Sequence, residues 1–337
     1  MANYVGLDIH KRFTYGVIKN EQGNKIKEDK FENSQENFDL FLKDCKPEET
    51  KIVMESTGVW EFIYDLLESK HYEIKLANPF RTKAIASARI KTDSIDAETL
   101  SDLLRANLIA ESYIPDKETR KIRDVIRQRK TIVKGRTQIK NKIHAILTRY
   151  GIKIPYTTLC NKAIIWMLEE GMSNLPSVKT ILVTYVSLLD KYNEELKIID
   201  ERIKDIAEKS SKTNLLMTIP GVGEIRAVEL MAEIADINRF ESSEKLCSYA
   251  GLVPSIRQSG NSLKFGRLMK QSSGALKNSL IESAWIIVRT KQENQLQMFY
   301  RILCFKKSKQ KAICAVARKL CCVVYAMLKK NQEFHYS

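Results

Sequence analysis

An unbroken series of apolar residues between positions 182 and 206 constrains the fold more than any other feature. Their spacings alternate between three and four residues over more than three heptads. The series is Leu182, Tyr185, Leu189, Tyr192, Leu196, Ile199, Ile203 and Ile206. This is the a/d pattern of a coiled coil and predicts a long helix with one narrow apolar seam. The seam can pair within the chain or with another protomer, and its regularity favours an oligomerising arm.

A second long helical segment, residues 117–150, holds much of the chain's positive charge. The chain has 56 Lys and Arg against 41 Asp and Glu, a net charge of +15, which favours a polyanionic partner over a membrane surface. The segment has 12 basic residues and only two acids, Glu118 and Asp124. A run of charged residues is often only a solvated helix face. Here, however, the two acids balance so little of the positive charge that a nucleic-acid-binding surface is favoured. The expected phosphate contacts are Arg127, Arg129, Lys130, Lys134, Arg136 and Lys140.

The remaining composition indicates the cellular compartment and the kinds of site that the chain can hold. No apolar run approaches the roughly 18 residues of a spanning helix, and the opening MANYVGLDIHK predicts a strand rather than a signal peptide. The seven cysteines include no C-x-x-C pair and predict reduced thiols. The four histidines are scattered, which argues against a zinc site. We therefore expect a cytoplasmic protein.

Residues 1–112 predict an α/β domain. Three short strands in meander come first, and strands then alternate with helices. The expected strands are residues 4–9, 13–19, 26–31, 51–55 and 73–77, and the expected helices are residues 33–45, 59–69, 79–88 and 94–110. This is the order of a ribonuclease-H-like fold, although doubly wound α/β folds stay open. Residues 113–212 form the basic helix and coiled-coil region, and residues 213–337 form a third, mainly helical domain.

Two acids lie within or at the end of predicted apolar strands. Asp8 is inside Tyr-Val-Gly-Leu-Asp-Ile, and Glu55 ends Ile-Val-Met-Glu. A carboxylate among apolar residues is costly unless a metal ion or a cation compensates it, while an ordinary edge-strand Asp is the plain alternative for Asp8. Gly6 would leave room for backbone or a ligand to approach closely. Active sites of open α/β sheets collect at the carboxyl ends of strands, where Glu55 is expected.

Asp93 and Asp96 form a second pair, in Lys-Thr-Asp-Ser-Ile-Asp-Ala. Their spacing puts both carboxylates on one face of a first helical turn. N-capping and helix-dipole complementation by Asp93, with Asp96 on the surface, is the plain alternative and explains one acid better than two. Arg89 and Lys91 just upstream could contact phosphate. Hard divalent ions take oxygen ligands and can stabilise the oxygens of a phosphodiester in transfer, so the four acids predict a Mg²⁺ or Mn²⁺ site.

The third domain opens with a glycine-containing turn, Ile-Pro-Gly-Val-Gly, between apolar helical segments at 215–227. It resembles a helix–hairpin–helix, in which Gly221 and Gly223 would let backbone N–H groups approach a phosphate. A plain helix–helix turn is the alternative. A dinucleotide fingerprint is excluded, because no strand precedes the turn and the third glycine is missing.

A Ser-Gly in a basic loop, Ser259-Gly260, is the other candidate for chemistry. The loop begins Tyr-Ala-Gly-Leu-Val-Pro, and its nearby cations, expected to contact nucleic acid, are Arg257, Lys264 and Arg267. A serine there can attack phosphate, since cations stabilise the alkoxide and the developing phosphorane charge. From spacing alone a Ser-Gly pair is an ordinary turn, and no neighbouring histidine offers a hydrolase-type triad.

In this order, the motifs resemble those of the insertion-sequence "one-ten" transposases, which include the pilin-gene invertases. The resemblance covers nearly the whole chain. It rests on V-G-L-D, M-E-S-T-G-V-W around Glu55, K-T-D-S-I-D-A around Asp96, I-P-G-V-G, and Y-A-G-L-V-P followed by S-G. Each motif is short, and their order and spacing together are specific.

The resemblance implies a site-specific transposase with two cooperating domains. The first would be similar to Holliday-junction resolvases of the RuvC type, with Asp8, Glu55, Asp93 and Asp96 as its metal-binding tetrad. Ser259, in the second domain, would form a covalent phosphoserine link to DNA, in a composite site built across protomers. The implied partners are double-stranded donor and target DNA, a structured non-coding bridge RNA, and further copies of the chain in a dimer or a synaptic tetramer. Such a protein would associate with the bacterial nucleoid when it acts.

The residues themselves leave other functions open. One is a metal-dependent junction nuclease that uses water instead of Ser259. Another is a non-catalytic architectural protein that binds nucleic acid through the basic helix and the hairpin. An actin-like sugar kinase is suggested by Val-Gly-Leu-Asp-Ile, but the later glycine-rich phosphate loops are missing.

Overall fold

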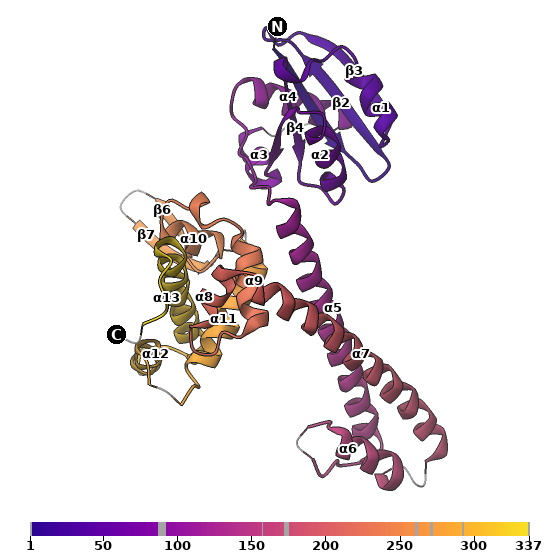
Figure 1. The fold of residues 1–337 in the computed structure, drawn as a ribbon, viewed down its shortest axis with the longest axis vertical. Coiled ribbons are helices and arrows are strands. Elements are labelled where there is room, and N and C mark those ends of the chain that lie inside the picture. Colours follow the sequence, from indigo (N-terminus) through magenta and orange to yellow (C-terminus); the bar gives the residue numbers. More distant parts are fainter. Residues whose placement is uncertain are drawn as a thin grey trace. The chain divides into compact units, whose positions relative to one another are not determined.

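The structure, a computed structural model, describes residues 2–86, 92–156, 158–171, 175–259, 262–269, 272–291 and 293–335. It divides into two compact units, Met1–Ile114 and Pro115–Ser337 (Figure 1). The basic helix, the apolar seam and the C-terminal helices all belong to the second unit. None of the described helices is long and apolar enough to cross a bilayer.

The first unit is built on a five-stranded sheet. Its strands are β1 (Asn3–Ile9), β2 (Phe13–Lys19), β3 (Lys25–Glu32), β4 (Thr50–Glu55) and β5 (Glu73–Ala77), in the order β3-β2-β1-β4-β5. Neighbours β1, β2 and β3 are antiparallel, whereas β4 runs parallel to β1 and β5 parallel to β4. The predicted meander followed by strand–helix alternation is therefore confirmed.

Helices cover both faces of this sheet because the apolar residues of its central strands alternate. Helices α1 (Gln35–Phe41) and α2 (Trp60–Glu68) share a core with Val5, Leu7 and Met54. On the opposite face, α4 (Asp93–Arg105) packs Leu100 and Leu104 against Val53. The short α3 (Pro79–Ile85) follows β5.

Gly6 sets the distance between β1 and α4. A Cβ at this position would lie 2.0 Å from the carbonyl oxygen of Ala97 and 2.7 Å from the backbone nitrogen of Ser101. The helix backbone thus occupies the space that a side chain would take. The close approach predicted for Gly6 is confirmed, and it is the approach of backbone.

In the second unit, two 33-residue helices, α5 (Lys117–Arg149) and α7 (Pro176–Glu208), lie side by side (Figure 1). Ile126 near the start of α5 packs with Ile203 near the end of α7, whereas Ile143 packs with Leu182, so the helices are antiparallel. The seam residues Leu182, Leu189, Leu196 and Ile203 are buried. The seam that favoured an oligomerising arm is thus covered within the chain, and its burial requires no second protomer.

The antiparallel pair is tight at Gly135, where a Cβ would lie 2.7 Å from the Tyr192 ring. Between the end of α5 and the start of α7, the short helix α6 (Asn161–Trp166) continues into a single π-helical turn, Met167–Gly171.

The rest of the second unit is a helical body with one β-hairpin. Its helices are α8 (Ser211–Met217), α9 (Glu224–Ile234), α10 (Ser243–Tyr249), α11 (Gly274–Ile287), α12 (Gln295–Cys304) and α13 (Lys309–Lys330), and short 3-10 turns occur at Pro47–Glu49 in the first unit and Ile237–Arg239 here. The hairpin joins β6 (Pro254–Ser259) to β7 (Ser262–Leu268). The sequence predicted only a loop around Ser259, so this strand pair is a correction.

Candidate functional site

Asp8 lies near the end of β1, on the sheet face that α4 covers. Gly6, two residues earlier, contacts Ala97 of α4, and strand alternation puts Asp8 on the same face. The side chain of Asp8 is 16% exposed, so it is neither in the core nor fully solvated. The apolar residues on either side of it, Leu7 and Ile9, point into the opposite core.

Glu55 is brought to the same face by the parallel pairing of β1 and β4. The pairing runs from Asn3 opposite Thr50 to Leu7 opposite Met54, and Asp8 and Glu55 are the next residues of the two strands. Val53, two residues before Glu55, packs against α4. The predicted location of Glu55 at the carboxyl end of a strand is therefore observed.

Asp93 and Asp96 both lie in the first turn of α4. The N-cap of the helix is Thr92, whose hydroxyl accepts a hydrogen bond of 3.2 Å from the backbone N–H of Ile95. Asp93 is thus not the N-cap, so of the two plain structural explanations for this acid only its interaction with the helix dipole applies. Both carboxylates stand near the positive end of the helix dipole, where negative charge is favoured. Arg89 and Lys91, the suggested phosphate contacts upstream, lie outside the described residues.

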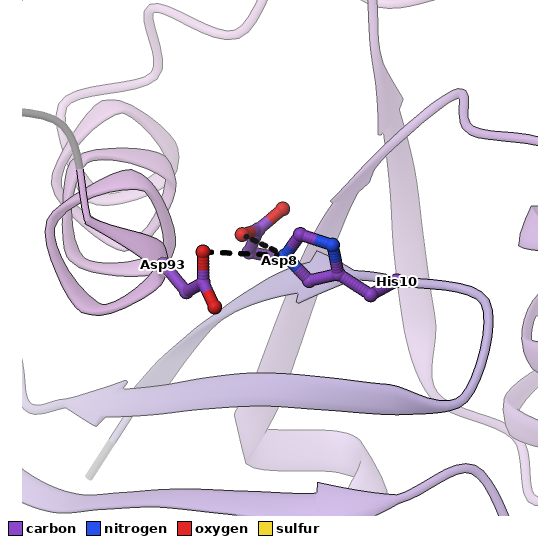
Figure 2. Close-up of side chains that lie close together, drawn as sticks. All are labelled: Asp8, His10 and Asp93. Carbon is purple, nitrogen blue, oxygen red and sulfur yellow. Dashed lines mark hydrogen bonds and ion pairs between the residues drawn. The ribbon is translucent and has the colours of Figure 1, made fainter.

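His10 joins two of these acids and was not anticipated as part of the site. Its Nε2 atom lies 3.1 Å from Oδ2 of Asp8 and 3.4 Å from Oδ1 of Asp93 (Figure 2). One ligand atom from each of the three residues lies within 4.8 Å of the others. Figure 2 shows the β1 acid and the α4 acid approaching the imidazole from two different elements. This Asp8–His10–Asp93 cluster is the compact centre of the candidate site.

The electrostatics of the cluster favour a bound cation. Burial raises the pKa of the Asp8 carboxyl, the interaction with His10 opposes that shift, and the charges of Asp93 and Asp96 raise the pKa further. Gathering carboxylates without enough positive charge disfavours their ionised forms. A divalent ion would offset this repulsion, and carboxylate oxygens are the ligands that Mg²⁺ and Mn²⁺ prefer.

The other two predicted ligands are near the cluster but not within it. Among the described residues, Glu55 and Asp96 lie outside the set whose ligand atoms are within 4.8 Å of one another. Asp96 is still close enough for its charge to raise the pKa of Asp8. The structure therefore gathers Asp8 and Asp93 directly, with His10, and sets Glu55 and Asp96 on the same side of the sheet.

Much of the charge on α5 is already compensated inside the second unit. Arg129 forms an ion pair with Asp200 at 2.6 Å, Lys130 pairs with the buried Glu229, and Arg136 lies 3.5 Å from the side-chain oxygen of Asn193. The exposed Arg127 pairs with Asp124 on its own helix. Within the described parts of the chain, the side chains of Lys134 and Lys140 have neither an ion pair nor a hydrogen bond, whereas Arg136 has the hydrogen bond to Asn193. These two lysines are the free cations of the predicted phosphate-binding set.

The glycine turn joins α8 to α9, as a helical hairpin requires. Gly221 has φ +78°, and a Cβ there would lie 2.4 Å from the Ile286 side chain of α11. Packing against α11 therefore explains Gly221 without a ligand. Gly223 is the N-cap of α9, and a Cβ there would meet nothing within 4 Å. Only Gly223 leaves open space at a helix N-terminus, so it is the stronger of the two candidates.

Ser259 ends β6 and pairs with Ser262 of β7. The side chains of Ser259 and Arg257 lie outside the described residues, whereas Lys264 and Arg267 on β7 are exposed. The predicted nucleophile thus stands at the end of a strand within a hairpin.

Comparison with known proteins identifies relatives over most of the chain. Residues 5–152 match a family profile described as a transposase, the DEDD transposase domain of the IS110 type, and residues 213–301 match the transposase family IS116/IS110/IS902. The transposase for insertion sequence element IS1328 of Yersinia enterocolitica is 22% identical over 98% of both chains. The transposase of IS1111A from Coxiella burnetii is 23% identical over 84% of this chain and 79% of its own. The pilin gene-inverting protein of Moraxella bovis is 26% identical over 84% and 81%.

Proposed function

This chain belongs to the IS110 family of transposases and is an enzyme of DNA recombination, and from that premise we propose how its two units divide the chemistry. The carboxylates Asp8, Glu55, Asp93 and Asp96 hold one or two divalent ions, Mg²⁺ or Mn²⁺. Ser259 is the nucleophile. The sheet order β3-β2-β1-β4-β5, with acids on β1, β4 and α4, supports a ribonuclease-H or RuvC-like catalytic domain.

The observation that carries the metal site is the Asp8–His10–Asp93 cluster. It brings acids 85 positions apart in the sequence to one place on the sheet. When bound there, a divalent ion would supply positive charge against the oxygens of a phosphodiester. His10, within hydrogen-bonding range of both carboxylates, orients them, and the dipole of α4 favours their negative charge.

In the proposed transfer step, the Oγ of Ser259 forms a bond to a DNA phosphorus. The bond from that phosphorus to a deoxyribose oxygen breaks; the Ser259 hydroxyl loses its proton, and the leaving oxygen takes up one proton, so the step balances. The result is a phosphoserine link that conserves the phosphodiester energy. Attack by a deoxyribose hydroxyl of a second strand reverses the step and rejoins the DNA. Lys264 and Arg267 on the neighbouring strand supply cations near the phosphate.

The partners follow from the same proposal. Duplex donor and target DNA would contact Lys134 and Lys140 of α5 and the N-terminus of α9 at Gly223, as in a helix–hairpin–helix. Resemblance to the family further suggests a structured bridge RNA as a guide. It also suggests a homo-oligomer, a dimer or a synaptic tetramer, in which Ser259 and the carboxylates complete one another.

A trapping assay tests this division of labour. Labelled donor DNA is incubated with the full-length chain and Mg²⁺, and covalent protein–DNA adducts are resolved under denaturing conditions. Ser259→Ala should abolish the adduct, while Ser262→Ala, a change at its paired position across the hairpin, should retain it. Asp8→Asn should abolish it as well.

The alternative function is a metal-dependent junction nuclease, since a metal held by the carboxylates would support attack by water on the phosphate without Ser259. In that case Asp8→Asn would abolish cleavage of a four-way junction and Ser259→Ala would not. Cleavage without an adduct in the unmodified protein would favour this alternative.

A further inference from the structure

The corner between α12 and α13 presents an unusually exposed aromatic ring beside uncompensated lysines. Phe305, at the end of α12, is 89% exposed, the highest value among the exposed large hydrophobic residues of the described chain. All positions from 305 to 311 are exposed. Four of these are the lysines Lys306, Lys307, Lys309 and Lys311. We refer to Phe305 and these four lysines as the α12–α13 corner.

The charge of the corner has no internal counterpart. Between Glu293 and Glu333 the sequence contains no acid at all. In the part of the chain that the structure describes, none of the four lysine side chains forms an ion pair or a hydrogen bond. By contrast, Arg301 on the preceding helix is paired with Glu293. Lys309 and Lys311 stand in the first turn of α13, where the helix dipole adds positive potential, and Lys306 and Lys307 lie between α12 and α13. The four lysines therefore present positive charge to solvent that no acidic side chain of the described residues offsets.

The apolar part of the corner extends along α12. Met298 and Ile302, seven and three positions before Phe305, are 50% and 61% exposed. These spacings place all three on one face of the helix. An exposed apolar stripe next to dense charge marks an interaction surface, and the charge identifies the class of partner as polyanionic.

From this juxtaposition of an exposed ring with unpaired lysines, we propose that the α12–α13 corner binds an unpaired, single-stranded stretch of nucleic acid. One base stacks on Phe305, and the adjoining phosphates contact the lysines. A duplex offers phosphates but keeps its base faces covered, so it would leave Phe305 exposed. The proposal deepens the proposed function, on which it rests, by assigning to this surface the unpaired strand of its nucleic-acid partner. Stacking and phosphate contact are common to DNA and RNA, and both are therefore tested.

The test is equilibrium binding of the full-length chain to fluorescent 20-nucleotide probes, by anisotropy, in EDTA. The probes are single-stranded DNA, single-stranded RNA of the same sequence, and the DNA duplex. Phe305→Ala should weaken binding to a single-stranded probe by about tenfold and leave duplex binding unchanged. Phe305→Trp should restore the affinity. Phe62→Ala is the matched control, since Phe62 is 57% exposed on α2 of the first unit, and it should bind like the unmodified protein.

The lysines have a separate readout. Lys306→Gln with Lys307→Gln should reduce the slope of log affinity against log salt by about 1.4 for single strands, since each phosphate contact contributes about 0.7. Which single-stranded probe loses affinity on Phe305→Ala identifies DNA or RNA as the natural partner. Because the binding assay is done in EDTA, it measures binding without catalysis. A failure of the proposed roles of Asp8 and Ser259 would therefore leave this result unchanged.

Three results would overturn the proposal. Phe305→Ala could leave single-strand binding unchanged, or it could weaken duplex binding to the same extent. It could also alter the sedimentation coefficient of the free protein without altering nucleic-acid affinity, which would identify the corner as a protein–protein interface.

Discussion

Replacement of Gly6 by alanine should separate the two elements that build the carboxylate site. The new Cβ would lie 2.0 Å from the Ala97 carbonyl oxygen, whereas ordinary contact begins at 3.4 Å. Helix α4 must therefore move away from β1 by about 1.4 Å, the difference between these distances. The obstructing atoms are backbone, so no side-chain rotation relieves the conflict. Overpacking of this kind costs about 1–3 kcal/mol of stability.

The displacement also acts on function, because α4 carries Asp93 and β1 carries Asp8. A misplacement of about 1 Å in a catalytic constellation costs on the order of 100-fold in rate. We expect Gly6→Ala to lower the rate of covalent DNA adduct formation by about that factor while the protein remains folded. Hydrogen exchange on the full-length chain, measured by mass spectrometry, should show reduced protection in the β1 and α4 peptides and unchanged protection in α5 and α7.

Gly58→Ala is the matched control for this experiment. Gly58 belongs to the same unit, and a Cβ there would meet nothing within 4 Å. Its exchange protection should equal that of the unmodified protein. If Gly6→Ala retained full protection in β1 and α4 and full adduct formation, the close packing of α4 at Gly6 would not be what positions the acids.

Other consequences concern the packing and charges of both units. The side chain of Lys19 is buried and ion-paired with Glu98 at 2.9 Å and Asp102 at 2.8 Å, so Lys19→Met should destabilise the first unit by about 1–3 kcal/mol in thermal unfolding. Hydrogen bonds from Lys19 and Lys25 lower the pKa of Glu98 in the folded state. The stability that ionised Glu98 contributes is therefore fully present above the ordinary Glu pKa and is lost as the pH falls through the lowered pKa of the folded state. Lys19→Met should therefore flatten the acid limb of the stability profile, and an unchanged limb would refute this assignment. Gly135→Ala should destabilise the α5–α7 pair because of Tyr192, and adding Tyr192→Leu should reverse the loss and recover up to about 1 kcal/mol of helix propensity. Lys134→Gln and Lys140→Gln should each lower the slope of log duplex affinity against log salt by about 0.9. Arg129→Gln should mainly reduce stability, since Arg129 is paired with Asp200. Equal slopes for all three variants would contradict the distinction between unpaired Lys134 and Lys140 and paired Arg129.

The strands and long helices could be predicted because their patterns are local. Residues 13–19 and 73–77 were predicted as strands with the bounds observed for β2 and β5, and the predicted helix 117–150 corresponds to α5, which ends one residue earlier, at Arg149. Boundaries that depend on a terminating residue were less accurate. The predicted helix 94–110 ends at Arg105, because Asn107 adopts a positive φ of 55° and the Leu108 N–H donates to the Leu103 carbonyl. Asparagine is one of the few residues that adopts this conformation readily.

The sequence predicted two members of the Asp8–His10–Asp93 cluster, the two acids, but not the histidine. Asp8 and Glu55 could be identified because a charge in an apolar strand needs a compensating partner. His10 was overlooked because its role depends on the approach of α4, which sequence spacing does not give. The available signal was the Asp-x-His spacing, which puts Asp8 and His10 on one side of an extended chain.

The prediction and the structure also differ at the α7 seam, where the cause is a tertiary contact, and at the β6–β7 hairpin, where the cause is a turn signal. The a/d seam of α7 specifies an apolar partner helix but not which one, and here α5 of the same chain buries it. For the hairpin, the sequence did contain a local signal: Gly260 and Asn261 separate two alternating segments. A two-residue Gly-Asn connection between such segments is typical of a β-hairpin.

Titration with Mn²⁺, followed by electron paramagnetic resonance of the free ion, tests the proposed metal site most directly. The full-length protein should bind Mn²⁺, and Asp8→Asn and Asp93→Asn should each weaken binding by at least about tenfold, since each removes a charged oxygen ligand. Asp29→Asn, at an exposed acid on β3, should bind like the unmodified protein. Equal affinity in all four proteins would contradict a metal site at the Asp8–His10–Asp93 cluster.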